Sequence, residues 1–220
     1  FRLDTAYHLD AALFGIYLRD KICLPAGTKH IVDTVLDANQ DETGAISGIV
    51  TTKSGILKAD LYIDCTGFKS LLLEQKLGVN FQSFHDTLQN DRAIATIIPY
   101  IDADIEMDSF TTSTAIESGW VWNIPLWNRI GTGYVYSSEF ASESEAEQQF
   151  RKHLQSNRMT VPNKARAENA EFRHIKIKHG VHDQAWVKNV LAIGLSNGFI
   201  EPLESTGLML THEKIGRAHV

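Results

Sequence analysis

The chain has 220 residues, 43% of them hydrophobic, which is enough for one large domain or two small ones with a buried core. Its formal net charge of −6 and its isoelectric point near 5.8 argue against a surface for nucleic acid or for an anionic membrane. No apolar run reaches the ~18 residues that a membrane-spanning helix needs. The two cysteines, Cys23 and Cys65, allow at most one disulfide, and we expect buried thiols in a cytoplasmic protein.

The first part of the chain is predicted to form one long helix followed by short strands. Apolar residues recur at helical spacing over Thr5–Lys21 and predict an amphipathic helix that is capped by Asp4 or Thr5. Three strand-like runs separated by turn residues predict an antiparallel excursion over 30–36, 45–52 and 56–59. The apolar run Leu61–Asp64 then leads into a turn at Cys65-Thr-Gly67, and a short helix is expected over 71–77.

Strands dominate from about residue 90. They are expected over 92–99, 111–116, 120–126 and 133–138, and we interpret them as one antiparallel sheet. Gly131-Thr-Gly133 is interpreted as a turn before the last of them, a helix is predicted over 143–156, and a further strand over 171–178. The predicted division is one module over 1–89, a sheet and helix over 90–186, and a return to the first module over 187–214.

The stretch from Val190 to Gly207 combines a buried strand, a turn of small residues and a helix start. Val190–Ile193 is the strand, and Pro202 stands where helices begin. The free N–H groups of such a helix start suit an anion or an electron-rich ring. The pattern leaves open the alternative of an ordinary strand–turn–helix unit.

Histidines gather in one later segment of the chain. His174, His179 and His182 have a spacing that matches no standard zinc pattern, so we predict solvated surface histidines and no metal site.

Two strings resemble those of the flavin-dependent tryptophan halogenases. They are Glu201-Pro-Leu-Glu-Ser-Thr-Gly207 and Gly119-Trp-Val-Trp-Asn-Ile-Pro125, and weaker matches such as Tyr7-His-Leu-Asp10 run along nearly the whole chain. The resemblance implies an α/β (α+β) protein with an FAD-dependent monooxygenase-like fold. In that fold a parallel flavin-binding sheet is joined by an antiparallel sheet on the substrate side, and both would be incomplete here.

The resemblance also implies an activity. A halogenase of this kind chlorinates or brominates an electron-rich aromatic, such as tryptophan or an indole, through a flavin hydroperoxide and hypohalous acid. Its cofactors would be FAD as FADH2, chloride or bromide, and O2. Its partners would be a separate flavin reductase and a small aromatic substrate, with a homodimer left open. The alternatives are a flavoprotein aromatic monooxygenase that hydroxylates, or a non-functional truncated flavoprotein.

Residue roles follow from the two matching strings. Glu204 matches the glutamate that stabilises the cationic ring intermediate and helps to remove its proton, and Ser205 matches its supporting serine. Thr206 and Gly207 match backbone amides near the halide and the flavin. The remaining expected cofactor contacts are Gly194, Leu195 and Ser196.

Four residues of the second string would line the tunnel between flavin and substrate, although two tryptophans on one strand face also suit a core. They are Trp120, Trp122, Ile124 and Pro125. Asp64 stands at the end of a predicted strand, and the sequence leaves two roles open for it: a contact to the flavin or a cap of the local turn.

The two ends of the chain suggest a fragment from a metagenomic sequence assembly. The chain begins at Phe1 without Met, and Ile215–Val220 is what one reading frame of a sequencing adapter encodes. The family's glycine-rich phosphate loop and its lysine are therefore expected upstream of Phe1, and residues that clamp the substrate downstream of Lys214. On this interpretation the chain alone is inactive.

Overall fold

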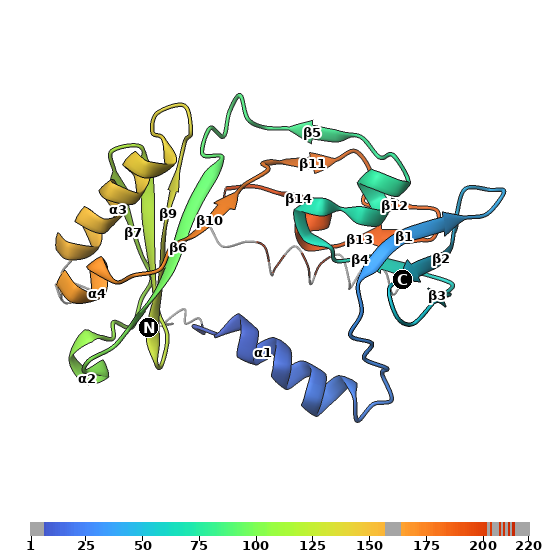
Figure 1. Ribbon diagram of the computed structural model, residues 1–220, viewed down its shortest axis with the longest axis horizontal. Helices are drawn as coiled ribbons and strands as arrows, with labels where there is room; N and C mark the ends of the chain where they lie inside the picture. Colours follow the sequence, from blue (N-terminus) through green and yellow to red (C-terminus); the bar gives the residue numbers. More distant parts are fainter. Residues whose placement is uncertain are drawn as a thin grey trace, which may run out of the picture. The chain divides into compact units, whose positions relative to one another are not determined.

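The computed structural model describes residues 7–156 and 164–201, together with residues 203, 207, 209, 211 and 213 (Figure 1). The chain groups into two compact units, one of residues 1–30 and 90–176 and the other of residues 31–89 and 177–220. The mixed α/β architecture agrees with the predicted fold class. Within the described residues, no helix is long and apolar enough to cross a membrane. That the second unit is a flavin-binding module stays a prediction.

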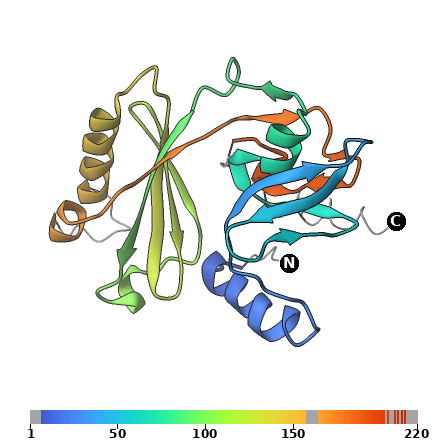
Figure 2. The same ribbon diagram turned by 45° about the vertical axis from the view of Figure 1, so that its right-hand side comes forward.

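The first unit is built on a five-stranded antiparallel sheet with the strand order β10-β6-β9-β8-β7. The helices α3 (Glu143–Ser156) and α4 (Lys164–Glu168) lie on one side of this sheet in both views (Figures 1 and 2). The short helix α2 (Ala103–Glu106) follows β6. The predicted bounds of β6 and of α3 are confirmed. The strands are β6 (Arg92–Pro99), β7 (Thr112–Ile116), β8 (Gly119–Pro125), β9 (Arg129–Tyr136) and β10 (Arg173–Lys176).

The core of the first unit lies between this sheet and α3. Val121 and Tyr134 pack from the sheet against Phe150 of α3, and all three are fully buried. The glycine pair predicted as a turn lies inside β9 instead, where Gly133 is the register partner of Trp122. A glycine is accommodated within this strand because the Trp122 ring occupies the space that a Cβ at Gly133 would need.

The first helix begins later than predicted. The helix α1 spans Ala11–Tyr17 and continues as a π-helix, η1 (Leu18–Cys23), while Asp4 and Thr5 lie outside the described residues. The Asp10 carboxylate accepts hydrogen bonds from the backbone N–H groups of Ala12 and Leu13, so Asp10 is the cap. The predicted start at Thr5 is wrong because Tyr7–Asp10 are not helical.

The second unit contains three three-stranded sheets within its described residues. In the first, β1-β2-β3, all pairs are antiparallel, as predicted (Figure 2). In the second, β12-β13-β4, the pairing of β13 with β4 is parallel, and the third has the order β14-β11-β5. The strands are β1 (Val35–Gln40), β2 (Ile46–Thr51), β3 (Ile56–Leu57), β4 (Tyr62–Asp64), β5 (Phe81–Ser83), β11 (Gly180–His182), β12 (Trp186–Val187), β13 (Val190–Ala192) and β14 (Gly198–Phe199).

The strand β1 runs later than the predicted 30–36 because its turn is set by Asp41. The Asp41 carboxylate accepts hydrogen bonds from the backbone of Thr43 and Ala45, which places the turn after Gln40. Residues 37–40, predicted as part of the turn between the first two strands, are therefore paired with β2.

Three short helical segments lie between the strands of the second unit: η2 (Gly67–Lys69), η3 (Leu71–Lys76) and η5 (Gly194–Ser196). The helix η3 packs Leu72 and Leu73 against Tyr62 and Val190 in the core of the unit. The turn between β4 and η2 carries Cys65, which is exposed, so the predicted burial of this thiol is wrong. Cys23 is half-buried.

Candidate functional site

The carboxyl ends of the two parallel strands form the first candidate site. In β4 and β13, Asp64 is the register partner of Ala192, and both strands end there. The backbone N–H of Ile193 donates to the Asp64 carbonyl at 3.0 Å, which holds the two strand ends together. In open α/β sheets, ligands bind in the crevice outside the carboxyl ends of the parallel strands.

Asp64 organises the turn after β4. Its Oδ1 accepts hydrogen bonds from the N–H and hydroxyl of Thr66, at 3.0 and 2.6 Å, and its Oδ2 accepts from the N–H groups of Leu72 and Leu73. Burial opposes ionisation, but these hydrogen bonds outweigh it and hold the pKa of this carboxyl below its ordinary value. Both oxygens are thus engaged locally, which supports the role of a turn and helix cap.

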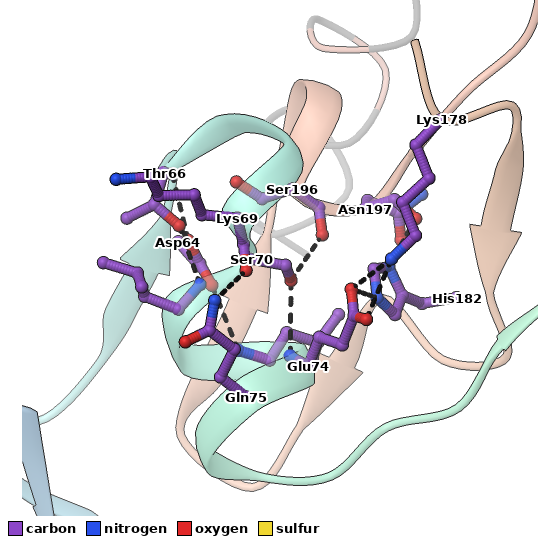
Figure 3. Close-up of polar contacts among 12 residues, drawn as sticks. Asp64, Thr66, Lys69, Ser70, Glu74, Gln75, Lys178, His182, Ser196 and Asn197 are labelled. Atoms are coloured by element: carbon purple, nitrogen blue, oxygen red, sulfur yellow. Dashed lines mark hydrogen bonds and ion pairs between the residues drawn. The ribbon is translucent and has the colours of Figure 1, made fainter. Parts of the chain in front are cut away.

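The predicted cofactor contacts Gly194, Leu195 and Ser196 form η5, directly after β13. Gly194 has a positive φ of 64°, which favours glycine. The backbone carbonyl of Ser196 accepts a hydrogen bond of 2.8 Å from Ser70 Oγ, so the turn is tied to the start of η3 (Figure 3). The structure therefore places the three predicted residues together, at the strand end where a ligand is expected.

Two buried polar atoms at this turn have no hydrogen-bond partner among the described residues: Ser196 Oγ and Asn197 Oδ1. The Ser196 side chain is fully buried and Asn197 is 8% exposed. Leaving such an atom unpaired costs about 1–3 kcal/mol. Both atoms are covered by protein, whereas Gly194 beside them is half-buried and Leu195 is exposed, so the phosphate–ribose chain of a nucleotide cofactor fits against the backbone of this turn.

A charged cluster that the sequence does not reveal supports the same turn. The Glu74 carboxylate of η3 is bound by Lys178 Nζ at 2.7 and 2.8 Å and by His182 Nε2 at 3.0 Å (Figure 3). Burial opposes ionisation of Glu74, but these hydrogen bonds outweigh it and hold the pKa of this carboxyl below its ordinary value. More than a hundred residues separate Glu74 from its partners, and no local pattern predicts such a contact.

The predicted surface position of the histidines is wrong for two of them. His179 and His182 are each 4% exposed, because the His179 ring stacks on Phe199 and the His182 ring lies between hydrogen-bond acceptors. His174 belongs to the other unit, where its Nε2 lies 2.8 Å from Glu147 of α3. The described residues contain no group of three side chains that could hold a metal ion.

The second candidate site is the face of the five-stranded sheet that points away from α3. Along β8, Val121, Asn123 and Pro125 are buried, while Trp120, Trp122 and Ile124 alternate with them and are half-buried. The two tryptophan rings lie 6.1 Å apart. The structure therefore brings three of the predicted tunnel residues to one face and places Pro125 on the other.

The start of α1 is attached to the end of the same strand. His8 Nδ1 lies 2.7 Å from the Pro125 carbonyl, and the Asp10 carboxylate, besides capping α1, binds Arg129 at 2.8 Å. The hydrogen bond from Arg129, assisted by those from the helix N–H groups, holds the pKa of Asp10 below its ordinary value. The Tyr7–Asp10 string thus has a structural role in fixing the β8–β9 hairpin to the helix.

The string that follows β14 is described in part. Glu204, Ser205 and Thr206 lie outside the described residues. Gly207 is helical and exposed, and the Thr211 hydroxyl donates to its carbonyl at 3.0 Å. The predicted helix start, Pro202, lies outside the described residues, while Gly207 and Thr211 are helical.

Comparisons with known proteins agree with one another along the chain. The family model described as "Tryptophan halogenase" matches residues 2–218. The tryptophan 6-halogenase SttH of Streptomyces toxytricini is 43% identical over 96% of this chain, which spans 38% of SttH. The chain therefore covers well under half the length of this relative.

Solved structures show the same likeness. The apo structure of VirX1 superimposes with a TM-score of 0.86 at 50% identity, covering 94% of this chain and 38% of VirX1. BrvH, a flavin-dependent halogenase from Brevundimonas sp. BAL3, gives a TM-score of 0.85 at 35% identity, covering 96% of this chain and 41% of BrvH.

Proposed function

The chain belongs to the tryptophan halogenase family, and on that premise we propose that the full-length protein is a flavin-dependent halogenase. The aromatic that it chlorinates or brominates would be electron-rich, of the tryptophan or indole type. The observation that carries the proposal is the presence of both strings, 119–125 and 201–207, in a chain that matches the family along nearly all of its length.

FAD is the proposed cofactor. Gly194, Leu195 and Ser196 would hold its polar chain, because this turn follows the parallel strand ends and presents the half-buried Gly194 and the exposed Leu195 there. Thr206 and Gly207 would offer backbone amides to the halide and the flavin ring. In its reduced form, FAD would give two electrons to O2, and the resulting peroxide-level oxygen would take two electrons from chloride or bromide to give hypohalous acid.

Glu204 is the proposed catalytic residue. Its carboxylate would stabilise the positive charge that develops on the aromatic ring and accept the proton that leaves the halogenated carbon. Ser205 would orient that carboxylate. Both proposals rest on the sequence match, since the two residues lie outside the described part of the chain.

Trp120, Trp122 and Ile124 would line the passage of hypohalous acid to the substrate. This proposal is supported by their position, because all three lie on the sheet face opposite α3. They are half-buried there and do not belong to the buried core between the sheet and α3. Pro125 would shape the same strand from its other face. A separate reductase would supply the reduced flavin. The protein would act in the cytoplasm, as a monomer or as a homodimer.

The test is a product assay with the full-length protein, reduced FAD, O2, and tryptophan or indole, in chloride or in bromide. We expect mass spectrometry to show a product in which one hydrogen is replaced by the halogen supplied. The variant Glu42→Gln serves as a control for the loss of a glutamate outside the proposed site. It removes an exposed carboxylate in the β1–β2 turn and should leave the product yield unchanged. A hydroxylated product that forms without halide would contradict the proposal and indicate a monooxygenase.

A further inference from the structure

His182 is buried between two groups that accept hydrogen bonds. It ends β11, and its side chain is 2% exposed. Its Nδ1 lies 2.9 Å from the Asn197 carbonyl oxygen, and its Nε2 lies 3.0 Å from Glu74 Oε2 (Figure 3). The Phe81 ring packs against it in an edge-to-face contact, with the ring centroids 5.1 Å apart.

Neither partner can donate a proton to the ring. A backbone carbonyl only accepts hydrogen bonds. The Glu74 carboxylate is ionised at neutral pH, well above the ordinary pKa of a glutamate, and Lys178 Nζ also donates to both of its oxygens, at 2.7 and 2.8 Å. A neutral imidazole carries one N–H and would leave one of its two nitrogens facing a lone pair, whereas an imidazolium has a donor on each nitrogen.

We propose that His182 is held in the folded protein as an imidazolium ion by Glu74, and that this ion is a positioning residue for the turn at Ser196 and Asn197. The charged groups that face its ring are Glu74 from η3 and, through the same carboxylate, Lys178 from the segment before β11. Lys178 is 39% exposed and lies over the Phe81 ring, so water and the ring share its charge. His182 has only the carboxylate and the carbonyl.

The turn is fixed because one carbonyl receives two hydrogen bonds from one residue. The Asn197 oxygen accepts from the His182 backbone N–H at 2.9 Å and from its ring at 2.9 Å. On the other side, Ser70 Oγ donates to the Ser196 carbonyl. The backbone between these anchors carries Ser196 Oγ and Asn197 Oδ1, the buried atoms without partners among the described residues. The role in ligand binding rests on the proposed function, in which this turn holds FAD.

Ring-nitrogen NMR of the full-length, cofactor-free protein tests the charge directly. With ¹⁵N-labelled histidine at pH 7, where a free histidine is mostly neutral, both His182 nitrogens should report N–H groups. In Glu74→Gln the ring should become neutral, with one protonated nitrogen. Lys178→Met removes the other cation from the same carboxylate and should leave His182 charged. A neutral His182 ring in the unaltered protein would overturn the proposal without the need for any variant.

FAD titration tests the positioning role. His182→Gln and Glu74→Gln should each raise the dissociation constant for FAD about tenfold, the equivalent of one charge-assisted hydrogen bond, while Lys178→Met should leave it unchanged. Equal losses in all three variants would mean that the cluster only stabilises the unit and would overturn the positioning role. Failure of the unaltered protein to bind FAD would refute the proposed function, whereas the NMR result would still decide the charge of His182.

Discussion

Gly133 shows what a single residue contributes to the sheet face that carries the tryptophans. A Cβ at this position would clash with the Trp122 ring and lie 2.6 Å from the Ile94 carbonyl oxygen. The neighbouring glycine of the same strand, Gly131, is different, because there a Cβ would meet only the Ile124 carbonyl at 3.8 Å. The missing side chain at Gly133 is therefore what leaves room for the Trp122 ring over β9.

We predict that Gly133→Ala destabilises the first unit by about 1–3 kcal/mol, because the indole or the backbone of β6 has to move. Gly131→Ala should have little effect and is the matched control in the same strand. Urea unfolding of both variants measures the difference. Equal stabilities would show that the Trp122 ring does not depend on the absence of a Cβ.

The position of Gly133 also shows where local sequence signals fail. Two glycines separated by one residue are typical of a turn. A glycine inside a strand has another explanation, which is that a large ring on the neighbouring strand needs the space of its side chain. That ring belongs to a residue already singled out, yet only the register of β8 against β9 brings the two together. The same limit applies to Glu74 and His182, whose contact depends on the packing of η3 against β11.

At the scale of elements, strongly periodic segments were predictable and turn-dependent ones were not. The strand β6 and the helix α3 have the predicted bounds because each has a continuous buried face. The start of α1 and the run of β1 differ from the prediction because one aspartate decides each: Asp10 by capping and Asp41 by closing a turn. Other acidic residues near each boundary have the same capping or turn-forming side chain. The sequence alone therefore does not indicate which of them fixes the boundary.

Asp64 caps the start of η3, so its carboxylate contributes to the stability of the second unit. We predict that Asp64→Asn lowers the free energy of unfolding by about 2 kcal/mol at pH 7, because the amide NH2 would face the N–H groups of Leu72 and Leu73 in place of an acceptor. The exposed Asp60 offers the control Asp60→Asn, which should be neutral. Urea unfolding at several pH values measures both.

The sign of the pH dependence follows from the lowered pKa of Asp64. A carboxyl whose pKa is lower in the folded state stabilises that state above its unfolded pKa of about 3.9, and the contribution disappears as the pH falls through the folded pKa. The difference between the unaltered protein and Asp64→Asn should therefore be constant from pH 7 to about pH 5 and shrink below pH 4. A difference that does not change with pH would contradict the capping role of the ionised form.

At the scale of the whole molecule, family membership was predictable from two short strings, and the arrangement of the sheets was not. The strings carry the residues on which the proposed chemistry depends, so a resemblance confined to them already names the family. The third sheet, β14-β11-β5, joins strands of two or three residues from distant parts of the chain, and such short strands leave no periodic signal.

Glu204→Gln in the full-length protein tests whether this chain carries the catalytic glutamate of a halogenase. With reduced FAD, O2 and halide, both proteins should deliver oxidised halogen to a diketone trap at the same rate. The variant should halogenate the aromatic substrate at least about 100-fold more slowly, because it lacks the carboxylate that accepts the proton. Unchanged halogenation by Glu204→Gln would contradict the catalytic role of Glu204, and hydroxylation in place of halogenation by the unaltered protein would contradict the proposed activity.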